Sequence, residues 1–195
     1  MSKIARKHLL RANQKLGPYI EKVPVLQLSV RNDIHPVNAI SEVVIGQMLS
    51  RDAARSIRSR VYRLMEENNL EFLGALTVDQ LRSSGLSGGK AKTVRSVFET
   101  YLEDSDRIDN WHKLDYLSLR DDVSTFWGIS DWTASILALF YFGQENVFPH
   151  KDRSIKRAVD KLSEKNIIID IEAASPYQSY LALYLWAILD NGFLD

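Results

Sequence analysis

The chain contains no cysteine, and this absence excludes two kinds of cross-link that can stabilise a fold. It can form neither a disulfide nor an iron–sulfur cluster held by cysteine thiolates. Its four histidines, at positions 8, 35, 112 and 150, lie too far apart in the sequence to predict a zinc site. We therefore expect an apolar core to hold the fold, and we expect no protein-bound metal.

Long apolar runs and an excess of charge are also lacking. No stretch of about 18 apolar residues occurs, so we expect no contact with a membrane. The first seven residues have no apolar run after their charges and do not predict a secretion signal. The 25 basic and 25 acidic residues cancel, so binding of a nucleic acid would need a local cationic face.

Helical periodicity dominates the sequence and predicts an all-α fold. The five prolines fall where helices are expected to begin or end. We expect Gly17-Pro18 to close the first helix, and the spacing of Thr77 and Gln80 predicts a capping box. Residues 167–169 form the only strand-like run, which is too isolated to make a sheet. The helices are expected at residues 4–16, 36–48, 53–67, 77–81, 89–102, 114–125, 133–142, 154–162 and 176–189.

A short glycine turn stands before the most apolar of these helices. It reads Phe126-Trp127-Gly128-Ile129-Ser130-Asp131-Trp132-Thr133-Ala134, and a weaker echo runs from Gly85 to Ala91. A turn that enters a helix leaves the first N–H groups unpaired, and phosphate oxygens can accept their hydrogen bonds. The other interpretation is a simple turn between helices. The residues predicted to bind phosphates are Gly128, Ile129, Ser130, Thr133 and Lys90.

The hairpin is followed, some twenty residues later, by Pro149-His150-Lys151-Asp152. This layout resembles the helix-hairpin-helix DNA glycosylases, the superfamily of endonuclease III, and is closest to 3-methyladenine DNA glycosylase II. The family's second hairpin glycine is Ser130 here, and serine tolerates a positive φ poorly. The resemblance implies a two-lobed helical bundle with an active-site cleft between the lobes. It implies one glycosylase unit over residues 1–195, with a central lobe at 37–140 that holds the hairpin 126–134, and a second lobe at 1–36 and 141–195.

By this resemblance Asp152 is the catalytic residue. A fixed carboxylate stabilises the positive charge that develops on a sugar as its bond to the base breaks, and it can orient the attacking water. Asp152 could instead cap the helix that follows, or do both. The lysine that attacks the sugar in bifunctional members is replaced by Trp132, which implies a monofunctional enzyme.

The resemblance also implies a base pocket and a wedge. Trp132 and Trp186 match pocket tryptophans, whose faces attract a cationic alkylated base, although both could be core residues. Met48, with Gln47, matches the segment that reaches into the duplex to fill the gap left by the flipped nucleotide, or it could be a core residue.

These features together predict a glycosylase that removes 3-methyladenine or 7-methylguanine from DNA in base excision repair. Two alternatives stay open: a glycosylase for another lesion, and a non-catalytic protein that binds damaged DNA. The expected partner is double-stranded damaged DNA, bound by a monomer in a bacterial cytoplasm or a eukaryotic nucleus. The resemblance implies no cofactor, and it allows a monovalent cation at the hairpin.

Overall fold

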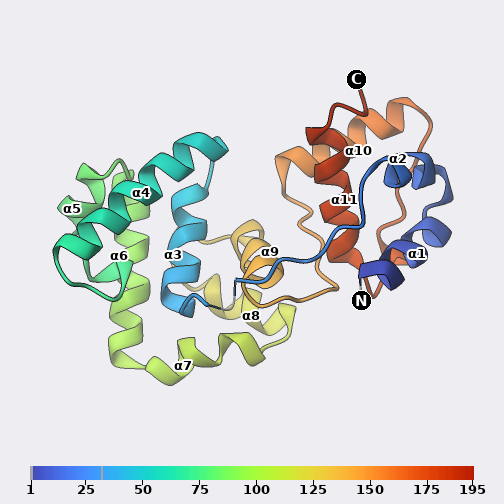
Figure 1. Ribbon diagram of the computed structural model, residues 1–195. Helices are drawn as coiled ribbons and strands as arrows, with labels where there is room; N and C mark the ends of the chain where they lie inside the picture. The colour runs from blue at the N-terminus through green and yellow to red at the C-terminus, as the bar shows by residue number, and fades with distance from the viewer. Residues whose placement is uncertain (1, 32) are drawn as a thin grey trace. The chain divides into compact units, whose positions relative to one another are not determined.

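The computed structural model describes residues 2–31 and 33–195, and this part of the chain is helical without any strand (Figure 1). The all-α prediction is confirmed, and residues 167–169 form no strand. The helices are α1 (Ser2–Ala12), α2 (Gly17–Lys22), α3 (Pro36–Gly46), α4 (Arg51–Glu67), α5 (Val78–Ser83), α6 (Gly88–Glu103), α7 (Ser105–Asp109), α8 (Tyr116–Val123), α9 (Asp131–Phe140), α10 (Arg153–Glu164) and α11 (Gln178–Asp190). Short 3-10 turns lie at Gln14–Leu16, Leu73–Ala75, Asn110–Lys113 and Glu172–Ala174.

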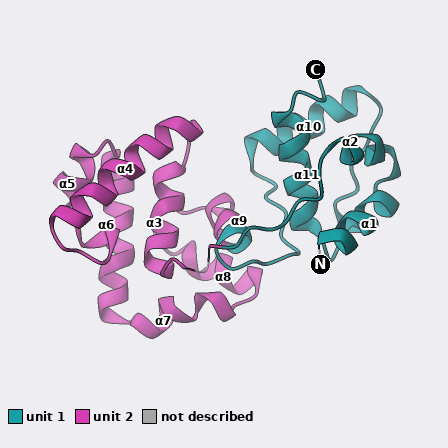
Figure 2. Ribbon diagram, in the orientation of Figure 1, with its two compact units in different colours: residues 1–30, 138–195 teal, residues 31–137 magenta. Residues whose placement is uncertain are grey.

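The chain divides into two compact units, shown in different colours in Figure 2. We call residues 1–30 and 138–195 the terminal unit, and residues 31–137 the central unit. None of the helices in the described part of the chain combines the length and the apolar character that crossing a bilayer requires.

The terminal unit is built around α11. This helix packs against α10 and α1, and α2 adds to the same cluster. Leu9 of α1, Ile20 of α2, Leu162 of α10 and Leu185 of α11 are all fully buried. Burial of each such side chain contributes about 1.5–3 kcal/mol, so α11 is held on several sides and can serve as a fixed support.

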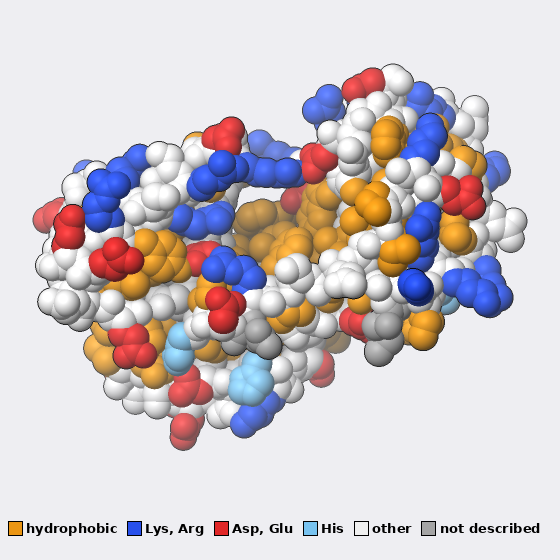
Figure 3. Space-filling view, viewed as in Figure 1, with side chains coloured by type: hydrophobic (Ala, Val, Ile, Leu, Met, Phe, Trp, Pro, Cys, Tyr) orange, Lys and Arg blue, Asp and Glu red, His pale blue; other side chains and the backbone are white. Residues whose placement is uncertain are grey.

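The central unit packs α3 against α6, and α4 and α5 against this pair. Its core includes Ile40, Val61, Leu81 and Val94. Figure 3 shows Lys and Arg side chains gathered along the surface of this unit near α4, a helix whose sequence contains arginines 51, 55, 58, 60 and 63. The zero net charge of the chain is therefore compatible with a local basic surface.

Several helix ends agree with the expected local chemistry. Thr77 and Gln80 form the predicted capping box. The prediction that Gly17-Pro18 closes the first helix is wrong, because α1 already ends at Ala12 and Pro18 lies in the first turn of α2. A proline needs no hydrogen-bonded N–H in a first turn, so the same dipeptide that can end one helix begins another here.

Candidate functional site

Asp152 lies at the start of α10, at the end of a tight turn. Its N–H donates to the carbonyl of Pro149 at 2.9 Å, which closes the turn Pro149-His150-Lys151-Asp152. Its Oδ1 accepts hydrogen bonds from the backbone N–H groups of Ser154 (2.9 Å) and Ile155 (3.0 Å). The carboxylate therefore caps α10, and the positive end of the helix dipole stabilises its charge.

Trp186 reaches the same carboxylate from α11. Its indole N–H donates to Oδ1 of Asp152 at 3.0 Å. The Trp186 ring also packs on Phe140, with centroids 5.8 Å apart and planes inclined by 31°. Both Trp186 and Asp152 are only half-buried. Trp186 is therefore not simply a core residue. Its indole N–H holds the carboxylate of Asp152, the candidate catalytic acid, in one orientation.

Two further residues of α11 support the loop that leads to Asp152, and the sequence analysis did not assign them. The buried Ser179 hydroxyl lies 2.6 Å from the Gln144 carbonyl and 3.0 Å from that of Val147, and the Ser179 N–H donates to Glu145 O. The Tyr180 hydroxyl donates to Oε1 of Glu145 at 3.0 Å. Both residues lie directly after Pro176-Tyr177-Gln178, at the start of the helix that carries Trp186. Gln178 donates to Ile171 O at 3.2 Å.

The hairpin of the central unit runs from Phe126 to Ala134. Gly128 has φ +77°, a conformation that favours glycine, whereas Ser130 is not among the described residues with positive φ. The serine in place of the family's second glycine therefore needs no strained backbone. Ile129 donates its N–H to Phe126 O at 3.2 Å and buries its side chain, so this amide closes the turn itself.

Side chains from two other segments hold this hairpin. The Gln47 amide Nε2 donates to Gly128 O (3.1 Å) and to the hydroxyl of Thr133 (2.8 Å), whose side chain is buried. The buried Thr93 hydroxyl lies 2.8 Å from Trp127 O. The turn and the first turn of α9 are thus fastened together, which presets the direction of the amides at the start of α9.

Met48 follows Gln47 directly and is a surface residue. Its side chain is 75% exposed, so the core interpretation does not apply. Its φ is +57°, a conformation that costs a residue with a Cβ on the order of 1–3 kcal/mol. An apolar side chain held outward on a strained backbone suits the predicted wedge.

A lysine that contacts a phosphate would extend into solvent, but the side chain of Lys90 is directed toward the protein. Its Nζ donates to Ile45 O (2.9 Å) and Gln47 O (2.6 Å), at the carboxyl end of α3. Burial lowers the pKa of Lys90. In this structure Lys90 stabilises the segment that precedes Met48, a cation at the negative end of a helix dipole.

Asp131 is an acidic residue inside the predicted phosphate-binding hairpin. The hydroxyl of Tyr116 donates to its Oδ1 at 2.9 Å, and burial together with this hydrogen bond raises the pKa of Tyr116. Trp132, the next residue, is half-buried, so it is neither a full core residue nor a fully open one.

No group of three or more His, Cys, Asp or Glu side chains that could hold a metal ion occurs within residues 2–31 and 33–195. The protein groups at hand are a capped carboxylate in the terminal unit, and a hairpin with an adjacent exposed methionine in the central unit.

An all-α fold with this hairpin, and with a helix-capping aspartate some twenty residues after it, is the arrangement that the resemblance to the helix-hairpin-helix DNA glycosylases implies. No protein-family model matches the chain, but a curated relative and solved structures do. A relative from Schizosaccharomyces pombe, the alkylbase DNA glycosidase-like protein mag2, is 25% identical over an alignment of 201 positions, which covers 95% of this chain and 93% of the relative.

Solved structures confirm the fold. The crystal structure of a DNA-3-methyladenine glycosidase from Bacillus halodurans matches with a TM-score of 0.74 at 24% identity, over 97% of this chain and 90% of that one. The Schizosaccharomyces pombe 3-methyladenine DNA glycosylase Mag1, in complex with abasic DNA, matches with a TM-score of 0.73 at 23% identity, over 93% and 94% of the two chains. The curated relative and the solved structures together support the resemblance to the helix-hairpin-helix glycosylase superfamily, and their names agree with the predicted enzyme class, a DNA N-glycosylase.

Proposed function

We propose that the protein is a monofunctional DNA glycosylase that flips alkylated purines such as 3-methyladenine and 7-methylguanine out of duplex DNA and releases them by hydrolysis. The observation that carries this proposal is the Asp152 carboxylate, held by two backbone N–H groups and by the indole N–H of Trp186. A carboxylate fixed in this way does not need to reorganise as charge develops on the sugar.

The chemistry follows from the substrate and this acid. An alkylated purine carries a positive charge, so the electron pair of the N-glycosidic bond leaves with the base and neutralises it. The sugar C1′ becomes positive and is stabilised by Asp152, which also orients the water that adds to C1′ and takes up its proton. The products are the free base and an abasic site.

The central unit supplies the DNA contacts in this proposal. The amides at the start of α9 bind a phosphate, while Met48 fills the space of the extruded nucleotide. The half-buried Trp132 offers an aromatic face to the cationic base. Because Trp132 stands where bifunctional members carry a lysine, no Schiff base forms with the sugar, and the strand is not cut.

Release of free bases from alkylated DNA, measured by chromatography, tests the proposal. We expect the native protein to release 3-methyladenine or 7-methylguanine, and Asp152→Asn to lose this activity while still binding abasic-site DNA. Asparagine caps a helix about as well as aspartate, so the fold should survive. Full activity of Asp152→Asn contradicts the role of Asp152.

Two more outcomes separate the alternatives. Release of another base, such as a deaminated one, from a panel of lesions would indicate a glycosylase for that lesion. Binding of abasic-site DNA without release of any base would indicate a non-catalytic damage-binding protein. Covalent enzyme–DNA captured with borohydride would contradict the monofunctional mechanism.

A further inference from the structure

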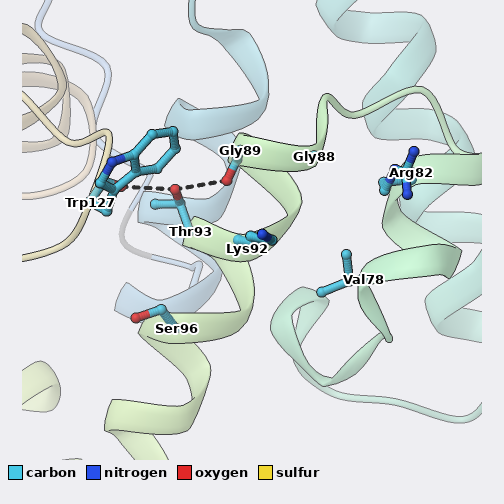
Figure 4. A pocket seen from close by; sticks show the side chains of 8 residues that line it. All are labelled: Val78, Arg82, Gly88, Gly89, Lys92, Thr93, Ser96 and Trp127. Atoms are coloured by element: carbon cyan, nitrogen blue, oxygen red, sulfur yellow. Dashed lines mark hydrogen bonds between the residues drawn. The ribbon is translucent and has the colours of Figure 1, made fainter.

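The central unit has a groove beside the hairpin that the proposed glycosylase chemistry does not use. It has a volume of about 580 Å³ and crosses one face of α6, from α5 to the hairpin (Figure 4). This volume is in the range of sites for molecules of nucleotide size. The lining residues are Val78, Arg82, Gly88, Gly89, Lys92, Thr93, Ser96 and Trp127.

Trp127 forms one wall of this groove and is 74% exposed. It directly precedes Gly128, so the hairpin turn itself carries the ring. Its edge rests on the first turn of α6, because a Cβ built at Gly89 would lie 2.8 Å from Cζ3 of the indole. Thr93 fixes the Trp127 carbonyl at 2.8 Å. The indole is therefore supported at its base and along one edge while most of its surface faces solvent.

Cations stand on the opposite side of the groove from Trp127. Lys92 is exposed and has no ion-pair partner among residues 2–31 and 33–195, and Arg82 has only a weak contact with Asp79 at 3.9 Å. Ser96 adds an exposed hydroxyl one turn further along α6. An aromatic face with cations along the same groove is how proteins bind unpaired nucleotides: the base stacks on the ring, and the phosphates lie near the cations.

We propose that this groove binds an unpaired nucleotide segment of a DNA strand, with a base stacked on Trp127 and phosphates at Lys92 and Arg82. The proposal rests on the proposed function, because the groove begins at the hairpin that is taken to hold a DNA phosphate. Because Trp127 directly precedes Gly128 and lines the groove, a strand held at the hairpin would lie beside the indole. Duplex DNA with a single-stranded extension would then bind more tightly than blunt duplex DNA.

The first experiment uses a short oligo(dT), which contains no lesion and no duplex. Trp111 is fully buried, and Trp132 and Trp186 are half-buried, so we expect Trp127 to contribute most to the solvent-sensitive fluorescence. We expect oligo(dT) to quench the fluorescence of the native protein and of Asp152→Asn equally, and Trp127→Phe to lose most of this quenching. Quenching that persists in Trp127→Phe would overturn the proposal.

The second experiment measures affinity for labelled oligo(dT) by fluorescence anisotropy. We expect Trp127→Ala to weaken binding about 5-fold or more, because stacking of one base contributes about 1–3 kcal/mol. Lys92→Gln should lower the slope of log K against log salt by about 0.7, the value for one phosphate contact on single-stranded nucleic acid. Lys113→Gln, which removes an exposed lysine of the central unit outside the groove, is the matched control and should change neither quantity.

Gly89→Ala gives a test that does not remove any contacting group. Alanine suits a helix better than glycine, but its Cβ would meet the indole and move the ring. We expect a stable protein with weaker oligo(dT) binding. Native affinity in both Gly89→Ala and Trp127→Ala, or no binding of oligo(dT) by the native protein, would overturn the proposal. Base release from blunt duplex DNA, lost in Asp152→Asn, is a separate readout, so failure here leaves the glycosylase proposal standing.

Discussion

The indole N–H of Trp186 donates a hydrogen bond to Oδ1 of Asp152 at 3.0 Å, although the two residues lie 34 positions apart in the sequence. The same oxygen accepts two backbone N–H groups of α10. One carboxylate oxygen is thus held from two helices of the terminal unit. Trp186 is a positioning residue for Asp152 in this arrangement, in addition to any contact with the base.

Trp186→Phe separates these two roles, because phenylalanine keeps an aromatic ring beside Phe140 but has no N–H donor. A hydrogen bond to a charged group contributes about 1.5–3 kcal/mol. We expect the single-turnover rate of base release to fall by about 10- to 100-fold, while affinity for abasic-site DNA changes little. Trp186→Ala should impair both, because the ring is lost as well. An unchanged rate in Trp186→Phe would show that the two cap hydrogen bonds are sufficient.

Local features of the site could be predicted from the sequence, because each depends on neighbouring residues. The capping position of Asp152, the glycine at the turn and the capping box of Thr77 and Gln80 all follow from short-range backbone chemistry. Ser130 replaces the family's second glycine without straining the turn, because within residues 126–134 only Gly128 has a positive φ.

Contacts between distant segments could not be predicted in the same way. Gln47 meets Gly128 and Thr133 across 81 and 86 positions, and Lys90 meets the end of α3 across more than 40. Such contacts depend on how helices pack, which a single sequence does not determine. The end of the first helix was also missed, since Gly17-Pro18 suits both a helix end and a helix start.

Met48→Gly tests the wedge through a change that should not harm the fold. Glycine adopts φ +57° without the cost that a Cβ imposes, on the order of 1–3 kcal/mol. We expect the free energy of unfolding, measured in urea, to stay constant or rise, while base release falls about 10-fold or more. Met48→Leu keeps an apolar side chain of similar size and should retain most activity. Native activity in Met48→Gly would contradict the wedge, and a loss of stability would contradict the argument that the Met48 backbone is strained.

Substitutions of Gln47 test whether DNA binding requires the hydrogen bonds that hold the hairpin in place. Gln47→Ala removes two hydrogen bonds of about 1 kcal/mol each and should weaken duplex binding about 3- to 10-fold. Gln47→Glu should be worse, because a carboxylate cannot donate to Gly128 O and repels a nearby phosphate. Gln14→Glu adds the same charge at an exposed position of the terminal unit and serves as the control. Equal binding by the two glutamate variants, measured by anisotropy, would count against this role of Gln47.

Asp131 should weaken the binding of DNA, because its negative charge lies at the start of the helix whose amides are proposed to bind a phosphate. Asp131→Asn removes the repulsion, so we expect affinity for duplex DNA to rise about 3- to 10-fold at low salt, with a smaller gain at high salt. The variant should also be less stable by about 0.3–1 kcal/mol, since a carboxylate at a helix N-terminus is favourable. Glu103→Gln, at an exposed position near the end of α6, makes the same change of charge and should leave affinity unchanged.

A hydrogen bond from Tyr116 fixes the position of the Asp131 carboxylate. Its hydroxyl donates to Asp131 Oδ1 at 2.9 Å, and Tyr116→Phe removes this bond and frees the carboxylate to turn. If the bond keeps the charge away from the phosphate, Tyr116→Phe lowers affinity, and this effect vanishes when Asp131 is already asparagine. A double-mutant cycle on the duplex dissociation constant measures this coupling directly. An equal effect of Tyr116→Phe in both backgrounds would mean that Tyr116 acts through packing alone.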